Sequence, residues 1–169
     1  MQSNIYFILS IRFIVLVLLQ VLILNNINFL GYINPYIYLL FTLTFPFNGN
    51  KSMLIVLSFL IGLTIDLFGD SGGIHAAACV VIAYLRPVIL KFSFGVSYEY
   101  NSIKINKVDF GQRLIYISVM VFLHHIVLFS MEIFNINHIM LLLKSTLFSG
   151  IFSIILILSS ISIFSKKSK

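Results

Sequence analysis

Residues 62–87 read GLTIDLFGDSGGIHAAACVVIAYLRP and decide what kind of fold this chain can form. The stretch contains the end of one apolar segment, a glycine-rich turn and most of the next apolar segment. Asp66 and Arg86 lie within these apolar segments, in surroundings otherwise suited to lipid. A carboxylate at membrane depth costs several kcal/mol unless it is paired, protonated or hydrated. Other groups must therefore stabilise Asp66, and identifying them is the most direct route to function.

The composition of the chain requires a bilayer as its solvent. Of its 169 residues, 60% are hydrophobic and only 9% are charged. An average soluble domain is about 45–50% apolar and about 25% charged. A water-soluble fold of this length could not bury so much apolar surface. The sequence therefore predicts an all-α membrane protein, folded as a single integral membrane domain over residues 1–169.

The apolar segments predict a six-transmembrane-helix bundle. A helix of about 20 residues crosses a hydrocarbon core of roughly 30 Å. The second segment is shorter, because Pro35 to Phe47 provides only about 20 Å of helix, although Asn34-Pro35 is a typical helix start. This segment either begins nearer Leu30 or is re-entrant, and we expect it to cross. The predicted spans cover residues 5–24, 31–47, 53–69, 74–94, 113–134 and 138–164.

The basic residues indicate how the bundle is oriented. The net charge is +6, but these residues lie at segment ends and in short tracts. That distribution indicates membrane topology and contact with membrane lipid, and no nucleic acid is expected as a partner. With six spans, the loop at Lys51, the loop at 91–113 and the tail at 166–169 share one side, and the opposite loops contain no Lys or Arg. The positive-inside rule then places the N and C termini in the cytoplasm, whereas five spans would divide the basic loops.

Depth along the helices predicts which polar groups meet Asp66. Counted from Met53 on the inner side, Asp66 lies about 20 Å up, in the outer third of the bilayer. Arg86 lies about 18 Å below the outer end of its own helix, in the inner third, so the two cannot pair. Lys144 lies about 9 Å below the outer start of the last span, and His75 is also near the outer side. We therefore expect a polar cluster of Asp66 with Lys144 or His75.

The remaining intramembrane polar residues have structural interpretations. Arg12 and Gln20 share one face of the first helix and are expected to face the bundle, with Arg12 reaching toward the inner headgroups. Arg86 is likewise expected to reach the inner headgroups. His124 and His125 lie near the bilayer midplane, and they point about 100° apart on a helix, so one metal cannot bind both from this helix alone. One of the two is expected to face the interior through a hydrogen bond.

Motifs for bond-breaking chemistry do not occur in the sequence. It lacks the H-E-x-x-H, P-loop and G-x-S-x-G motifs and paired glutamates at helical spacing. The chain has only five acidic residues, so acid–base catalysis has few candidates. Cys79 is the single cysteine and allows neither an intrachain disulfide nor a cysteine metal cluster. We expect no catalytic residue, no cofactor and no metal site.

Two stretches resemble the rod shape-determining protein MreD family. One is F-L-I-G-L-T-I-D at residues 59–66, followed by the Gly-Gly turn and A-A-A-x4-A-Y-L-R-P. The other is N-P-Y-x-Y-L-L-F-x-L-x-F-P at residues 34–46. The resemblance covers the whole chain in length, span count and motif order, and a glutamine often closes the first span in that family. The matching positions in this chain are Gly62, Asp66, Gly73, Pro35, Pro46 and Gln20.

The resemblance implies a non-enzymatic scaffold in the inner (cytoplasmic) membrane of bacteria. Members of the family act in the elongation (rod) complex with MreC, with the actin-like MreB, and with the peptidoglycan polymerase RodA and its penicillin-binding partner. They link cell shape to peptidoglycan synthesis, and no catalytic residue is carried over. The loop at 95–112 is the largest soluble surface, and we expect it to meet a cytoplasmic partner or to lie on the anionic inner leaflet.

An alternative function follows from the fold that the resemblance implies. The MreD family is similar in fold to the substrate-capture subunits of energy-coupling-factor vitamin transporters, which are six-helix bundles. Those subunits dock their energising partner through alanines spaced four apart on the first span, which allow close helix crossing. The first span of this chain contains no alanine, and this favours the scaffold over a substrate-binding transporter subunit.

Overall fold

The computed structural model describes residues 2–27, 29–46, 50–95, 105, 108–133 and 138–165, with side chains between residues 6 and 163. Every regular element in these residues is a helix. The long helices are α1 (Gln2–Leu22), α3 (Lys51–Gly69), α4 (Ile74–Phe94), α5 (Phe110–Ile133) and α6 (Ile139–Ser165), and the short ones are η1 (Leu24–Asn26) and α2 (Leu39–Thr44). All five long helices are long and apolar enough to cross a membrane. The described part of the chain is therefore all-helical, and the protein is a multi-pass membrane protein, as predicted.

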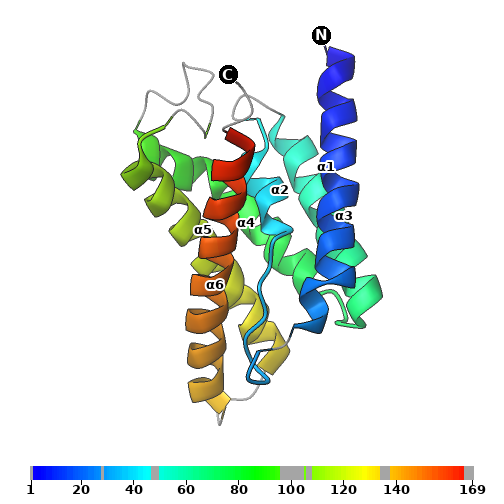
Figure 1. Cartoon of the computed structure of the whole chain (residues 1–169), viewed down its shortest axis with the longest axis vertical. Coiled ribbons are helices and arrows are strands. Elements are labelled where there is room, and N and C mark those ends of the chain that lie inside the picture. The colour runs from blue at the N-terminus through cyan, green and yellow to red at the C-terminus, as the bar shows by residue number, and fades with distance from the viewer. Residues whose placement is uncertain are drawn as a thin grey trace.

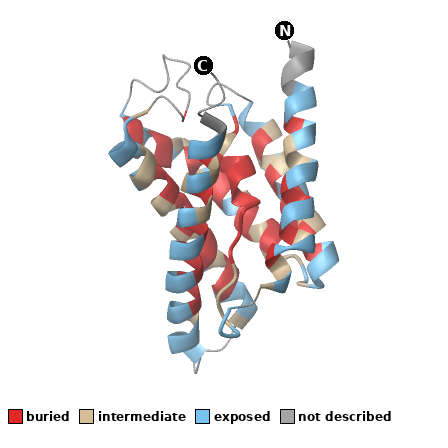
Figure 2. Ribbon diagram, viewed as in Figure 1, coloured by how far each residue is buried: buried red, intermediate tan, exposed pale blue. Residues whose placement is uncertain are grey.

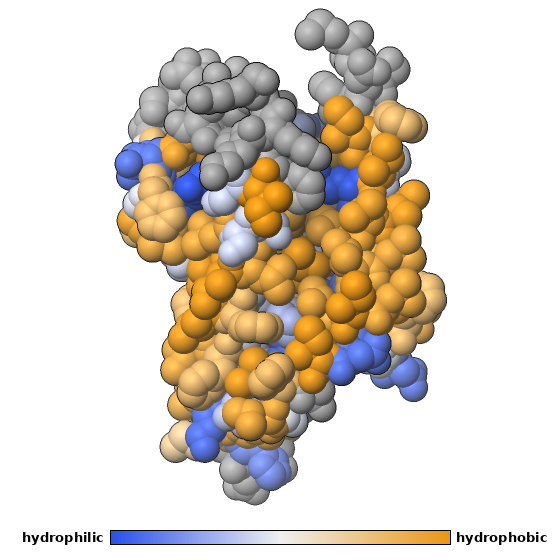
Figure 3. Space-filling model, viewed as in Figure 1, coloured by the Kyte–Doolittle hydropathy of each residue, from blue (hydrophilic) through white to orange (hydrophobic). Residues whose placement is uncertain are grey.

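The long helices form a bundle in which neighbours in sequence are neighbours in space (Figure 1). α3 packs against α4, α4 against α5 and α5 against α6, while α1 lies beside α3 at one edge. The start of α1 and the end of α6 lie at the same end of the bundle. Buried residues occupy the centre (Figure 2), and apolar side chains cover most of the described part of the face seen in Figure 3. Such a surface is stable in contact with lipid and unstable in contact with water.

The helix expected over residues 31–47 is not continuous. Residues 33–37 run extended through the bundle toward α2, which is only six residues long. We call residues 33–45 the inner segment, because its side chains from position 36 to position 43 are all buried. The prediction that a helix starts at Asn34-Pro35 is wrong, since backbone groups there bond to side chains of other helices. The predicted partner-binding loop at 95–112 falls mostly outside the described residues.

Gly62 lets α3 and α4 approach each other closely. A Cβ atom at Gly62 would lie 2.6 Å from the Cα atom of Ala76 and 2.6 Å from the carbonyl oxygen of His75. Both are backbone atoms, which cannot rotate aside. In the turn between the helices, Asp70 and Gly73 adopt left-handed conformations, with φ of 50° and 96°. Close helix packing thus explains the glycine at position 62, and the left-handed backbone conformation explains the glycine at position 73.

We expect Gly62→Ala to lower the free energy of unfolding by about 1–3 kcal/mol through overpacking. The loss occurs although alanine is the better helix former by about 1 kcal/mol. Gly150→Ala on α6 is a matched control, because its Cβ would lie 2.8 Å from a ring atom of the Phe122 side chain, which can rotate. Thermal unfolding in detergent measures both variants. An unfolding midpoint of Gly62→Ala equal to that of the unchanged protein would contradict the close approach.

Candidate functional site

Gln20 fixes the extended half of the inner segment to α1. Its Nε2 donates to the carbonyl oxygen of Pro35 at 3.0 Å, and its Oε1 accepts from the amide of Ile37 at 2.9 Å. Nε2 also donates to Oδ1 of Asn25 at 2.8 Å. The side chain is completely buried. Gln20 therefore supplies hydrogen bonds that a helix would otherwise form for itself at membrane depth.

Two serines on α6 fix the same half of the segment from the other side. Ser149 Oγ accepts from the amide of Asn34 at 3.1 Å, and Ser153 Oγ accepts from the amide of Tyr36 at 2.9 Å. The serines are four residues apart and so lie on one face of α6. They bond to amides two residues apart, which point in the same direction along an extended chain. This pairing explains why the chain is extended here.

Arg86 fixes the other end of the inner segment. It is only 3% exposed, and its Nη2 donates to the carbonyl oxygens of Leu43 and Phe45, at 3.4 and 2.5 Å. Its Nε donates to the hydroxyl of Tyr116 at 2.9 Å, and that hydroxyl donates to the Leu43 carbonyl at 3.2 Å. The cation thus satisfies carbonyls at the C-terminal end of α2. The prediction that Arg86 reaches the inner headgroups is wrong, because these buried carbonyls hold it inside the bundle.

Arg12 binds the same end of the segment from α1. Its Nη1 donates to Oγ1 of Thr44 at 2.9 Å and to the Thr44 carbonyl oxygen at 3.4 Å. Arg12 is half-buried, so both Arg12 and Gln20 face the bundle. The segment ends at Phe45, and the next residue, Pro46, is exposed.

Asp66 caps the N-terminus of α4. Its Oδ1 accepts from the hydroxyl of Ser71 at 2.6 Å and from the amide of His75 at 3.1 Å, and its Oδ2 accepts from the amide of Ala76 at 2.8 Å. The residue preceding α4 is Gly73, which has no side chain to cap the helix. A carboxylate from α3 takes that role, in a position where the α4 dipole favours negative charge. Three donors thus stabilise the buried carboxylate.

The expected pairing of Asp66 with Lys144 is not found. Lys144 is exposed on α6, and no ion pair joins it to Asp66 in the described part of the chain. The second expected partner, His75, does contact Asp66, but through its backbone amide. The prediction compared the depths of charged side chains only. It did not consider the unpaired backbone amides at the start of α4, which bond to the carboxylate.

Tyr38 connects two histidines in the centre of the bundle. Its hydroxyl lies 2.7 Å from Nδ1 of His75 on α4 and 3.0 Å from Nε2 of His124 on α5. One hydroxyl proton can serve only one of them, so the other histidine must donate. Nδ1 of His124 has no hydrogen-bond partner among the described residues. A buried N–H without a partner is rarer than an acceptor without one, so His124 donates from Nε2 and Tyr38 donates to His75.

His125 is buried as completely as His124, so both histidines face the interior, whereas one of the two was expected to do so. His125 Nδ1 donates to the carbonyl oxygen of Val121 at 2.7 Å, and Nε2 accepts from the hydroxyl of Ser153 at 3.3 Å. α5 packs between α4 and α6, so two adjacent residues can each face a neighbouring helix. His124 faces the α4 side and His125 faces α6.

The site is a network of hydrogen bonds that connects α1, α3, α4, α5 and α6 to the inner segment. No group of three or more His, Cys, Asp or Glu side chains in the described residues could hold a metal ion. Sequence reasoning missed Tyr38, Tyr116, Ser149 and Ser153. The spacing of the two serines was the available signal, because hydroxyls four residues apart in an apolar helix commonly bond across a helix interface.

Comparison of this chain with protein-family models, with curated proteins and with solved structures found no match. The resemblance described from its motifs therefore stays a prediction.

We expect Tyr38→Phe to lower the free energy of unfolding by about 1–3 kcal/mol, because two buried imidazole nitrogens lose their partner. The ring and its packing are retained, so the loss reports the hydroxyl alone. Tyr84→Phe is the matched control, since Tyr84 lies on α4 and is 71% exposed. Denaturation in detergent measures both variants, and equal stabilities would contradict the bridging role.

Proposed function

We propose that this chain is a non-enzymatic scaffold of the bacterial inner membrane, an MreD-type component of the elongation (rod) complex. In this role it links MreB and MreC to RodA and its penicillin-binding partner, and so connects cell shape to peptidoglycan synthesis. The supporting observation is that the two stretches resembling the family form one structural unit. Residues 34–46 bond to the α3–α4 hairpin at three points along their length: Tyr38 to His75, Thr42 to Ser58, and Leu43 to Arg86.

Four of the six positions of the resemblance have a structural role in this unit. Gly62 and Gly73 shape the hairpin, Asp66 caps α4, and Gln20 binds the inner segment. The segment is rigid because side chains of α1, α4 and α6 bond to its backbone groups inside the bundle. A scaffold needs a rigid body that presents constant outer faces to its partners.

We infer six crossings, with the inner segment as the second. It runs from the end of the bundle where α1 finishes to the end where α3 begins (Figure 1). Lys51 at the start of α3 and Lys91 in the last turn of α4 are both exposed, at the same end as the start of α1. The positive-inside rule assigns that end to the cytoplasm, and with it both termini.

Partners must be recognised mainly within the lipid. The exposed apolar residues of α1 and α6 form much of the described outer surface. Partner helices can therefore pack on these faces through shape complementarity and van der Waals contact.

Affinity purification of the tagged full chain from its host membrane tests the proposal. We expect MreC, MreB, RodA and the penicillin-binding partner to be recovered, compared with an equally tagged unrelated membrane protein, and depletion to round a rod-shaped host. Recovery of none of the four would reject the scaffold. Recovery of a vitamin together with an ATP-hydrolysing module would instead support the substrate-capture subunit.

A further inference from the structure

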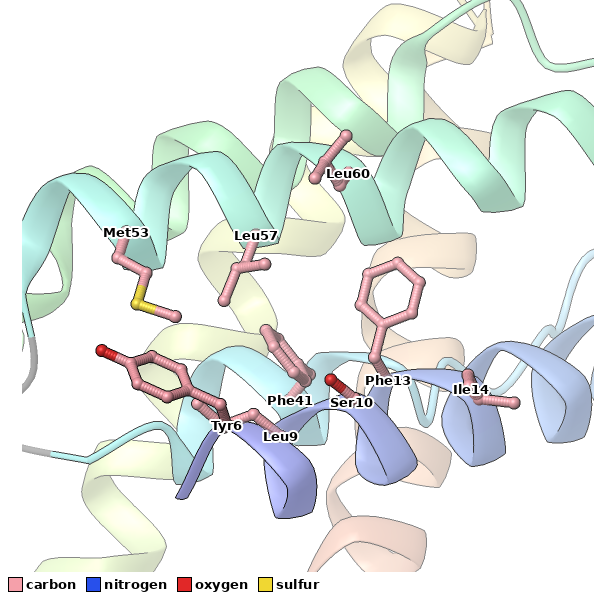
Figure 4. A pocket seen from close by; sticks show the side chains of 9 residues that line it. All are labelled: Tyr6, Leu9, Ser10, Phe13, Ile14, Phe41, Met53, Leu57 and Leu60. Atoms are coloured by element: carbon pink, nitrogen blue, oxygen red, sulfur yellow. The ribbon is translucent and has the colours of Figure 1, made fainter. Parts of the chain in front are cut away.

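An apolar groove lies between α3 and α1, the least buried of the five long helices (Figure 4). Its volume is about 350 Å³. The lining comes from three elements, with Phe41 of α2 between the two long helices. The lining residues are Tyr6, Leu9, Ser10, Phe13, Ile14, Phe41, Met53, Leu57 and Leu60.

The groove ends within one half of the bilayer. Tyr6 and Met53 stand at the end where α1 and α3 begin, and Phe13 and Ile14 of α1 and Leu60 of α3 stand toward the other end (Figure 4). The Phe13 ring packs edge-on against the Phe41 ring, with centroids 5.8 Å apart and an interplanar angle of 89°. From position 6 to position 14 a helix rises about 12 Å. One leaflet contributes about 15 Å of hydrocarbon, so the groove is open to a single leaflet.

The length of the groove and the polarity of its lining indicate which kind of molecule can occupy it. A transmembrane helix is about 10 Å wide and about 30 Å long, and it needs a face along the whole span. A polar small molecule needs several convergent polar groups, whereas the lining offers two hydroxyls, those of Tyr6 and Ser10. A single hydrocarbon chain matches both the length and the apolar walls.

We propose that this groove binds one acyl chain of a phospholipid from the leaflet at which α1 and α3 begin. Tyr6 stands at the mouth with its hydroxyl near the ester region of the lipid, as tyrosines do at membrane interfaces. Lys51, the exposed first residue of α3, lies at the same end and reaches the headgroup phosphate by its flexible side chain. The bound chain fills the gap between the two helices and holds α1 against the bundle. This inference does not depend on the proposed function.

Tryptophan fluorescence tests the proposal, because the chain contains no tryptophan. Tyr6→Trp places the probe at the mouth of the groove. Phe7→Trp is the matched control, one residue away at the same depth and 67% exposed. Delipidated protein in detergent is titrated with phosphatidylglycerol carrying brominated acyl chains. We expect quenching of the Tyr6→Trp probe to saturate at one lipid per protein, and quenching of the Phe7→Trp probe to rise without a plateau at that ratio.

Variants that fill the groove distinguish a bound acyl chain from general contact with lipid. Ser10→Phe or Leu57→Phe, each added to Tyr6→Trp, is expected to abolish the saturable quenching. Ile11→Phe, on the same helix and outside the groove, is expected to preserve it. Helical content and a single gel-filtration peak establish that each variant is folded. Two filling variants on different helices are used, so that the test still works if one of them does not fold. Parallel quenching of both probes, or saturable quenching that survives both filling variants, would overturn the proposal.

Discussion

Asp66→Ala is expected to lower the free energy of unfolding by about 3 kcal/mol or more. The carboxylate accepts from the hydroxyl of Ser71 and from the amides of His75 and Ala76, and alanine would leave all three without their acceptor. Each buried polar group without a partner costs about 1–3 kcal/mol. Local unfolding should begin at the first turn of α4. The hydrogen-exchange rates of the His75 and Ala76 amides should therefore rise before the protein unfolds globally.

Three variants distinguish a helix cap at Asp66 from an ion pair with Lys144. Asp66→Asn keeps one acceptor oxygen, so its stability should lie between those of the alanine variant and the unchanged protein. Asp70→Asn removes a neighbouring exposed charge from a left-handed residue that asparagine tolerates, and it should change little. Lys144→Ala should also change little, because Lys144 does not contact Asp66. A loss for Lys144→Ala as large as that for Asp66→Ala would restore the ion pair and reject the cap.

The long helices were predictable because lipid imposes a simple requirement on sequence. About 20 consecutive apolar residues are needed to cross, and polar turns must separate them. The expected span at 74–94 coincides with α4 (Ile74–Phe94) for this reason. The flanking Gly73 and Gly95 both have positive φ, at 96° and 73°, and they mark its ends in the sequence.

The inner segment was not predictable from its own residues. Asn34-Pro35 has the local pattern of a helix start, and local pattern favours a helix from there onward. The amides of Asn34 and Tyr36 instead bond to serines that lie 115 and 117 positions later in the chain. Such long-range hydrogen bonds override local propensity where no water is present to compete.

The candidate site was partly predictable, because polar residues in apolar helices must have partners. Asp66, Arg86 and His124 were identified by this rule, and each is buried. Their partners were missed, both the backbone groups that bond to Asp66 and Arg86 and the hydroxyls of Tyr38 and Tyr116. The sequence does not show which carbonyls or amides are free until the broken helix and the helix ends are placed.

Gln20→Leu is expected to lower the free energy of unfolding by about 2–6 kcal/mol, the sum of about 1–3 kcal/mol for each of two buried backbone groups left without a partner. These groups are the carbonyl of Pro35 and the amide of Ile37. Leucine is similar in size and more apolar, so lost packing does not explain the effect. Hydrogen exchange should increase at the Ile37 amide and in α2, because α1 no longer holds the segment.

Side-chain length and position provide the controls for Gln20. Gln20→Asn has the same amide on a shorter side chain that cannot reach both backbone groups, so it should be destabilised to an intermediate degree. Leu19→Ala removes a partly exposed apolar side chain from the neighbouring position and should have a smaller effect. Denaturation in detergent ranks the variants. If Gln20→Leu is as stable as the unchanged protein, the inner segment does not depend on hydrogen bonds from α1. The hydrogen bonds from α6 alone would then keep it extended inside the bundle.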